Sequence, residues 1–266
     1  MLFAACSTRT EGFHCKQLVD ASLPDISSED EEFDNIATAF MDEQLLKAIN
    51  LVNMDLEQET RQVVLLGCGL DTRPYRLPWP GGTVLFEVAG TDAHALAVSR
   101  LKAAGAHVPR ACLLRRVSAT LGSDAGFAAS LSRAGLRGDR LSLWALQGLA
   151  GLGLDRAALQ NIFTDVASVA AFGSILVGEL PVMSRSEAED VLAEFGFLGR
   201  VISAYQLSKP DRDQVETSQQ EGQAEKAQRW LFIAQCQQRS LEEMTTYADH
   251  VAAMEEAGED FFGNFS

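Results

Sequence analysis

A glycine-rich turn after a buried strand is the feature of this sequence best able to do chemistry. Residues 62–76 read QVVLLGCGLDTRPYR, in which an apolar run stops at Gly67-Cys68-Gly69. Such a run is typical of a strand buried in a parallel sheet, and glycines allow a backbone to approach a bound nucleotide closely. Asp71 can cap the helix that follows and leave free amides directed toward a ligand. The pattern predicts a site for an adenosine-type cofactor.

Other chemistries fit the sequence less well. A dinucleotide fingerprint would need a third glycine where Thr72 stands, which argues against a nicotinamide dehydrogenase. Cys68 could be mistaken for a nucleophile, but a small packing residue between two glycines is the simpler interpretation. No Ser-His-Asp pattern stands out, and no metal site is expected. The histidines never occur at HxH or HxxxH spacing; they are His14, His94, His107 and His250.

The elements that must position this turn alternate along the chain. Strand patterns followed by helical patterns are typical of a doubly wound α/β sheet, in which ligands bind beyond the carboxyl ends of the strands. No strong helix separates the last two strands, so the last strand is expected to be antiparallel. The predicted strands are Gln62–Leu66, Thr83–Val88, Ala111–Val117, Leu141–Leu146, Ser174–Gly178, Val201–Ala204 and Trp230–Gln235, and the predicted helices are Asp92–Ala104, Phe127–Ala134, Asp155–Ala171 and Ser186–Phe195.

Three segments are expected along the chain. Residues 1–60 form an N-terminal helical cap segment, with apolar residues at helical spacing before the first strand. Residues 61–239 form the α/β domain, and its polar insertion 211–228 is a mobile loop, either a lid or a surface excursion. Residues 240–266 form a C-terminal helix and an acidic, aromatic tail, which either packs on its own domain or docks on a protein partner.

Composition excludes several classes of protein. The chain has 266 residues, a formal net charge of −15 and 47% hydrophobic residues, so it can bury a large core but has no basic surface for nucleic acid. No apolar run is long enough for a membrane span. The five scattered cysteines lack a CxxC pair, which suits a soluble protein of a reducing intracellular compartment. Cytoplasm and an organelle stroma or matrix are not distinguished.

The glycine turn also carries a family resemblance. GCGLDTRPYRLPWP followed by TVLFEV resembles the GAGLDTRAYRLPWP…FEVD signature of the leucine carboxyl methyltransferase family, whose relatives include S-adenosylmethionine-dependent O-methyltransferases. Supporting segments are IATAFMDEQLLKAI, LSLWALQGL, SILVGEL and LFIAQ, so the resemblance covers most of residues 30–236. It implies a class I methyltransferase-like (Rossmann-like) fold that is mostly parallel, with S-adenosylmethionine at the glycine turn.

The same resemblance implies that several cofactor anchors have changed. The family places an acid on the cofactor ribose where this chain has Ala89. Two arginines that hold the cofactor carboxylate correspond to Ala37 and Ala39. The acids that follow the third and fourth strands correspond to Ser118 and Gln147. Because a hydrogen bond to a charged group contributes roughly 1.5–3 kcal/mol, several lost anchors would weaken cofactor binding strongly.

Two functions follow, from different classes. The first is an S-adenosylmethionine-dependent O-methyltransferase acting on a carboxylate or hydroxyl of a small molecule or protein. Its catalytic residues are not identifiable, since methyl transfer depends chiefly on proximity and alignment. The alternative is a catalytically degenerate methyltransferase-fold subunit that serves as a binding or assembly module. Asp92 could replace the ribose acid, and Arg76 could hold the cofactor carboxylate. The predicted cofactor-binding set is Gly67, Cys68, Gly69, Asp71, Arg73, Glu87 and Gln147.

Overall fold

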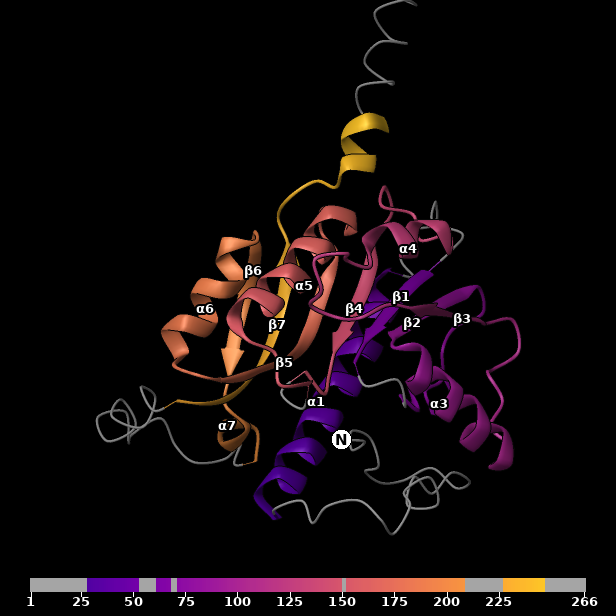
Figure 1. The fold of residues 1–266 in the computed structure, drawn as a ribbon, viewed down its shortest axis with the longest axis horizontal. Helices are drawn as coiled ribbons and strands as arrows, with labels where there is room; N and C mark the ends of the chain where they lie inside the picture. The colour runs from indigo at the N-terminus through magenta and orange to yellow at the C-terminus, as the bar shows by residue number, and fades with distance from the viewer. Residues whose placement is uncertain (1–27, 53–60, 68–70, 150–151, 209–226, 247–266) are drawn as a thin grey trace, which may run out of the picture.

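The computed structural model describes residues 28–52, 61–67, 71–149, 152–208 and 227–246 (Figure 1). Its strands are β1 Arg61–Leu66, β2 Thr83–Ala89, β3 Leu113–Ser118, β4 Ser142–Leu146, β5 Ile175–Met183, β6 Phe197–Ile202 and β7 Gln228–Cys236. Its helices are α1 Ser28–Val52, α2 Arg73–Arg76, α3 Thr91–Ala103, α4 Ala128–Arg133, α5 Arg156–Val169, α6 Arg185–Glu194 and α7 Ala204–Ser208.

The strands form one mixed sheet in the order β3-β2-β1-β4-β5-β7-β6. Strands β1 to β5 pair in parallel, whereas β7 runs antiparallel to both β5 and β6. The chain order reverses between β1 and β4, which is where a doubly wound sheet opens a crevice at its carboxyl edge. The predicted class I methyltransferase-like fold with an antiparallel last strand is therefore confirmed.

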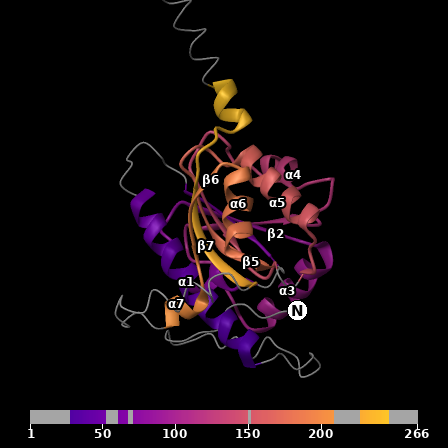
Figure 2. The same ribbon diagram turned by 90° about the vertical axis from the view of Figure 1, so that its left-hand side faces the viewer.

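Alternation along the strands assigns each face of the sheet to its own helices. In β1, Val64 and Leu66 belong to one apolar cluster, whereas Val63 and Leu65 belong to another. Side chains of a strand point alternately to opposite faces, so a fully apolar strand is buried on both. The edge-on view shows α1 on one side of the sheet and α4, α5 and α6 on the other (Figure 2).

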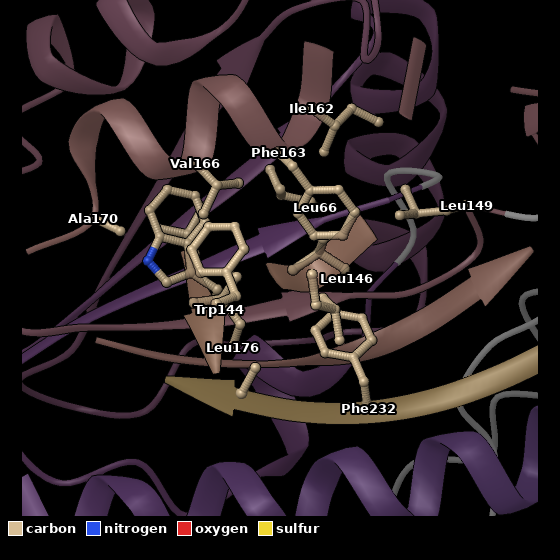
Figure 3. Packing of buried hydrophobic residues seen from close by; sticks show 14 of the residues in the cluster. Leu66, Trp144, Leu146, Leu149, Ile162, Phe163, Val166, Ala170, Leu176 and Phe232 are labelled. Carbon is tan, nitrogen blue, oxygen red and sulfur yellow. The ribbon is translucent and has the colours of Figure 1, made fainter. Parts of the chain in front are cut away.

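The larger cluster lies between the sheet and α4, α5 and α6. Phe163 of α5 and Trp144 of β4 are both fully buried, and Phe163 stacks against Phe195 with ring centroids 5.9 Å apart. Figure 3 shows the apolar side chains of α5 lying over those of β1 and β4. Asp155 fixes the start of α5 by accepting a 2.8 Å hydrogen bond from the Ala158 amide. This packing holds the carboxyl ends of β1 and β4 in register.

Helix α1 covers the opposite face. Ala37, Met41, Leu45 and Ile49 are almost fully buried and stand four residues apart, so they form one stripe of the helix. The predicted helical segment before the first strand is thereby confirmed. The stripe packs against β1, β4 and β5, and this places the polar residues beside it, at positions 38 and 42, near the carboxyl edge of the sheet.

The last part of the sheet differs from the prediction. The strand expected at Val201–Ala204 is β6, which begins earlier at Phe197, and Ala204 instead starts the short helix α7. The reason is that β6 is an edge strand whose middle residues are exposed, so it lacks an apolar run. Pairing with β7 also extends β5 to Met183, well beyond the predicted end at Gly178.

The C-terminal helix begins as the sequence predicts. Ser240 and Glu243 form a reciprocal capping box, with Ser240 N donating to Glu243 Oε2 over 3.0 Å and Glu243 N donating to Ser240 Oγ over 3.1 Å. Leu241 and Met244 of this helix are exposed, so the expected packing of both side chains on their own domain is not observed. The acidic tail, and the 211–228 loop up to position 226, lie outside the described residues.

Candidate functional site

Gly67 closes β1 where the backbone of β4 passes closest. A Cβ atom at this position would overlap the carbonyl oxygen of Gln147. A glycine is therefore required here by the neighbouring strand, independently of any ligand. Cys68 and Gly69 lie outside the described residues, so their predicted cofactor contacts stay predictions.

Arg73 is the centre of a buried polar network beneath this turn. Its side chain is 1% exposed, and its Nε atom donates to Asp42 Oδ1 of α1 over 2.7 Å. Its Nη1 atom donates to Asp71 Oδ2 over 2.7 Å, and its Nη2 atom donates to Gln147 Oε1. The guanidinium thus joins α1, the glycine turn and the end of β4. These contacts engage the guanidinium with the protein, and the predicted contact of Arg73 with a cofactor stays a prediction.

Electrostatics of this network favour the charged arginine. Burial lowers the pKa of Arg73, but the carboxylates of Asp71 and Asp42 outweigh burial and raise it above its ordinary value. Asp42 also pairs with Arg76, whose Nη2 atom donates to Asp42 Oδ1 over 2.9 Å. Arg76 donates through Nε to Thr72 Oγ1 over 3.0 Å as well. The charges of the two arginines and the two aspartates therefore cancel within the network.

Gln147 completes the network without adding charge. It is buried, accepts a hydrogen bond from Arg73, and donates through Nε2 to Thr38 Oγ1 of α1 over 2.8 Å. An acid at this position would leave one negative charge in excess in a buried cluster, and it could not donate to Thr38 as an ionised group. The neutral amide of Gln147 therefore suits this site, where α1 presents Thr38 next to Ala37.

Glu87 lies on the same face of the sheet, near the carboxyl end of β2. It is 2% exposed, and its Oε2 atom accepts a 3.0 Å hydrogen bond from Arg116 Nε of β3. Arg116 also donates through Nη2 to the hydroxyl of Tyr75 over 2.5 Å. The Oε1 atom of Glu87 is buried and has no hydrogen-bond partner of normal geometry among the described residues, although the backbone amide of Asp71 lies near the carboxyl group and lowers its pKa. A buried carboxylate oxygen without a partner is costly unless a ligand or water meets it.

His94 of α3 stands next to this carboxyl group. Its Nε2 atom is 3.1 Å from the carbonyl oxygen of Val117, and its Nδ1 atom is 3.9 Å from Glu87 Oε2. Burial lowers the pKa of His94, so the ring is neutral at neutral pH. Burial raises the pKa of Glu87 to about 7, although Arg116 opposes the shift. The carboxyl group of Glu87 therefore changes its charge near physiological pH.

Because the pKa of Glu87 is raised, the free energy of unfolding is expected to depend on pH, and Glu87→Gln should remove this dependence. An acid whose pKa rises from 4.5 to about 7 on folding is protonated in the folded state over that window but ionised in the unfolded state. Folding stability from this group is therefore present below pH 4.5 and lost as the pH rises to 7. The loss is on the order of 2 kcal/mol between pH 5 and pH 8. Urea unfolding of both proteins at the two pH values measures it, and equal pH slopes would contradict the shift.

A second buried ion pair, which the sequence analysis did not identify, involves Glu179. That residue is fully buried in β5, where its Oε1 atom accepts from Gly148 N over 2.6 Å. Its Oε2 atom accepts from Arg229 Nη2 over 2.7 Å. Arg229 also donates to Asp34 of α1 over 2.8 Å and lies over the Phe33 ring. Burial raises the pKa of Asp34 to about 6, against the effect of Arg229. Only the pairing of β5 with β7 brings these groups together.

The remaining candidate positions are spread over the same edge. Ala37 is fully buried in the α1 stripe, whereas Ala39 is exposed. Asp92 is exposed in the first turn of α3, and Ser118 is exposed at the end of β3. Ala89 is buried and stands two residues after Glu87, so both side chains point to one face of β2. Within the described ranges, no group of three or more His, Cys, Asp or Glu residues could hold a metal ion.

The sequence profile of the leucine carboxyl methyltransferase family matches residues 32–167, which is half of the chain. The chain belongs to this family. The matched region begins in α1 and ends in α5, so it contains the glycine turn, the Arg73 network and Glu87. Every changed anchor described above lies within it.

Two relatives illustrate how far the similarity extends. O-methyltransferase 1, chloroplastic, of Oryza sativa subsp. japonica is 34% identical over 160 residues, which are 60% of this chain and 42% of that protein. A candidate S-adenosyl-L-methionine-dependent methyltransferase of Parafrankia sp. (strain EAN1pec) is 39% identical over 159 residues, 60% of this chain and 46% of that protein. The matched region thus spans less than half the length of either relative.

Solved structures resemble the chain more loosely. The StiE O-MT fragment of residues 961–1257 gives a TM-score of 0.48 at 13% identity and covers 85% of this chain and 84% of that chain. A duf574 family protein from Streptomyces avermitilis gives 0.46 at 16% identity, with 85% and 98% covered. The fold assignment rests on the strand order and not on these matches. In the part of the chain that the structure describes, no helix is long and apolar enough to cross a membrane.

Proposed function

We propose that this protein is an S-adenosylmethionine-dependent methyltransferase whose acceptor atom is an oxygen. The acceptor is a carboxylate or hydroxyl of a small molecule or of a protein. Membership of the leucine carboxyl methyltransferase family and the name of the rice relative, an O-methyltransferase, support this choice. If the tests below fail, the alternative function applies, which is a catalytically degenerate subunit that serves as an assembly module.

The observation that carries the proposal is the unpartnered Oε1 atom of Glu87. It lies near the carboxyl end of β2, beside the switch point where such sheets bind adenosine-type ligands. Arg116 neutralises the other oxygen of the carboxyl group, so one oxygen is left to accept a hydrogen bond from a ribose hydroxyl. Glu87 thereby replaces the ribose-binding acid that the family resemblance implies at the position of Ala89, two residues further along the same face of β2.

The chain's own residues would bind and align the reactants. S-adenosylmethionine supplies a methyl group on a sulfonium, and its transfer requires an acceptor oxygen in line with that group. Gly67 lets the backbone that follows β4 pass close to the end of β1, and Asp71 fixes the start of α2 by accepting from Arg73 N over 2.8 Å. Gln147 holds the end of β4 against α1. Transfer to a carboxylate would break the sulfonium–methyl bond, form a methyl ester and release S-adenosylhomocysteine with no proton to move, so the catalytic contribution is one of position. Transfer to a hydroxyl would also release a proton, which would pass to solvent.

Titration calorimetry of Glu87→Gln tests the proposal. At pH 8, where Glu87 is ionised, the wild-type protein is expected to bind S-adenosylmethionine and S-adenosylhomocysteine, and the variant should bind both about tenfold more weakly, because a neutral amide oxygen is a weaker acceptor for the ribose hydroxyl than a carboxylate. Glu189→Gln is the matched control, since that carboxylate is exposed and pairs only with Arg185 of its own helix. Absence of heat from the wild type at millimolar ligand would refute the proposal and leave the assembly module.

A further inference from the structure

We propose that this site recognises the adenosyl sulfonium of its ligand and does not recognise an α-carboxylate. Ligands that lack the carboxylate of S-adenosylmethionine are then bound at least as tightly as the complete cofactor. This inference rests on the proposed function and specifies the ligand class of the same site. It follows from the contacts of the arginine side chains at the carboxyl edge of the sheet, which are made with groups of the protein itself.

Arg73 is unavailable to a carboxylate ligand. Its Nε, Nη1 and Nη2 atoms all donate to side chains of the protein, and the residue is 1% exposed. Its backbone amide is used as well, since it donates to Asp71 Oδ1 over 2.8 Å. A ligand carboxylate would have to displace Asp42 or Asp71 from a buried pair, which leaves an uncompensated buried charge.

The other arginines of this edge that the structure describes are paired too. Arg76 donates to Asp42 through both Nη atoms and to Thr72 through Nε. Arg116 donates to Glu87 and Tyr75. Among the described residues of α1 the sole basic side chain is Lys47, which is exposed and pairs with Glu43 of its own helix over 2.7 Å. The positions where the family resemblance implies arginines on α1 carry alanine.

The net charge of the carboxyl edge also disfavours a ligand carboxylate. Four arginines share six carboxylates: Arg73, Arg76, Arg116 and Arg229 with Asp30, Asp34, Asp42, Asp71, Glu87 and Glu179. This excess of acid is one cause of the raised pKa values of Glu87 and Asp34, after burial. A cationic ligand relieves that excess, whereas a further carboxylate increases it. The edge therefore favours a sulfonium over an amino acid carboxylate.

Calorimetry with two ligands tests the inference on the wild-type chain. S-adenosylmethionine and its decarboxylated form, the adenosyl sulfonium of 3-methylthiopropylamine, differ only in the carboxylate. We expect the decarboxylated ligand to bind with an equal dissociation constant or up to about tenfold more tightly. Reproducibly weaker binding of the decarboxylated ligand would overturn the inference but leave the proposed function intact. Absence of heat from both ligands would refute the proposed function and, with it, the inference.

Asp42→Asn supplies a second test, because it releases Arg76, which is partly exposed, from its carboxylate. The ratio of the two dissociation constants should then move toward S-adenosylmethionine by about tenfold. Glu43→Gln is the control, since it removes an exposed acid one residue further along α1 and should leave the ratio unchanged. An unchanged ratio in a folded Asp42→Asn variant would contradict the role given to Asp42. Should that variant fail to fold, the wild-type comparison still decides the inference.

Discussion

Arg73→Met is expected to lower the free energy of unfolding by about 3–5 kcal/mol. The substitution keeps an unbranched side chain of similar length but removes the charge that Asp42 and Asp71 share inside the protein. It also leaves the carbonyl oxygen of the Gln147 side chain without its donor. Removing one partner of a buried pair is far more costly than removing an exposed pair, because the remaining charge stays desolvated. Urea denaturation followed by far-ultraviolet circular dichroism measures the loss.

Arg185→Met is the matched control for Arg73. Arg185 makes its 2.8 Å ion pair with Glu189 on the exposed face of α6, with about half of each side chain accessible. Pairs of this kind contribute roughly 0.3–0.5 kcal/mol. A loss of less than 1 kcal/mol for Arg73→Met would show that the network does not hold the turn.

Gly67→Ala is expected to have the second-largest effect, about 3 kcal/mol or more. The added methyl group overlaps the backbone carbonyl of Gln147, and backbone cannot rotate away as a flexible side chain can. The strands β1 and β4 would have to separate where their carboxyl ends frame the site. The midpoint of thermal unfolding should fall, and adenosyl ligand binding should fall with it.

Gly81→Ala separates this steric effect from a general cost of losing glycine. Gly81 lies in the turn before β2, and a Cβ there would meet its nearest neighbour, the Cβ of Ala111, at an ordinary 3.6 Å. A change within about 0.5 kcal/mol is expected. If Gly67→Ala were as stable as Gly81→Ala, the close approach of β4 would not be the reason for the glycine. A direct role for Gly67 beside the ligand would then remain.

These predictions bear on the relation between stability and binding in this protein. The Arg73 network joins α1 to the glycine turn, so loosening either element changes both folding and the ligand site. Gln147, where the family resemblance implies an acid beside the cofactor, makes internal contacts with Thr38 and Arg73. Internal contacts of this kind order a site in advance, which lowers the cost of binding.

The sequence by itself determined the sheet, its first strand and the residue types at the carboxyl edge. Apolar runs such as Val63–Leu66 specify buried parallel strands, because both faces of the sheet are covered. Residue types at capping-box spacing also mark the start of the C-terminal helix at Ser240, whereas the changed anchors at Ala37 and Ala89 are implied by the family resemblance. Such features depend on neighbours along the chain, and a sequence displays those directly.

Only the tertiary structure decided which charges meet. Asp42 and Arg73 are separated by 31 positions, and Glu179 and Arg229 by 50, so no local pattern links them. The pairings arise because α1 packs on the face of the sheet formed by β1, β4 and β5, and β7 inserts between β5 and β6. Burial then fixes their strength, since a charge without a partner is costly inside a protein. The sequence therefore could not show that Arg73 and Arg76, which follow the glycine turn, pair with carboxylates of the protein itself.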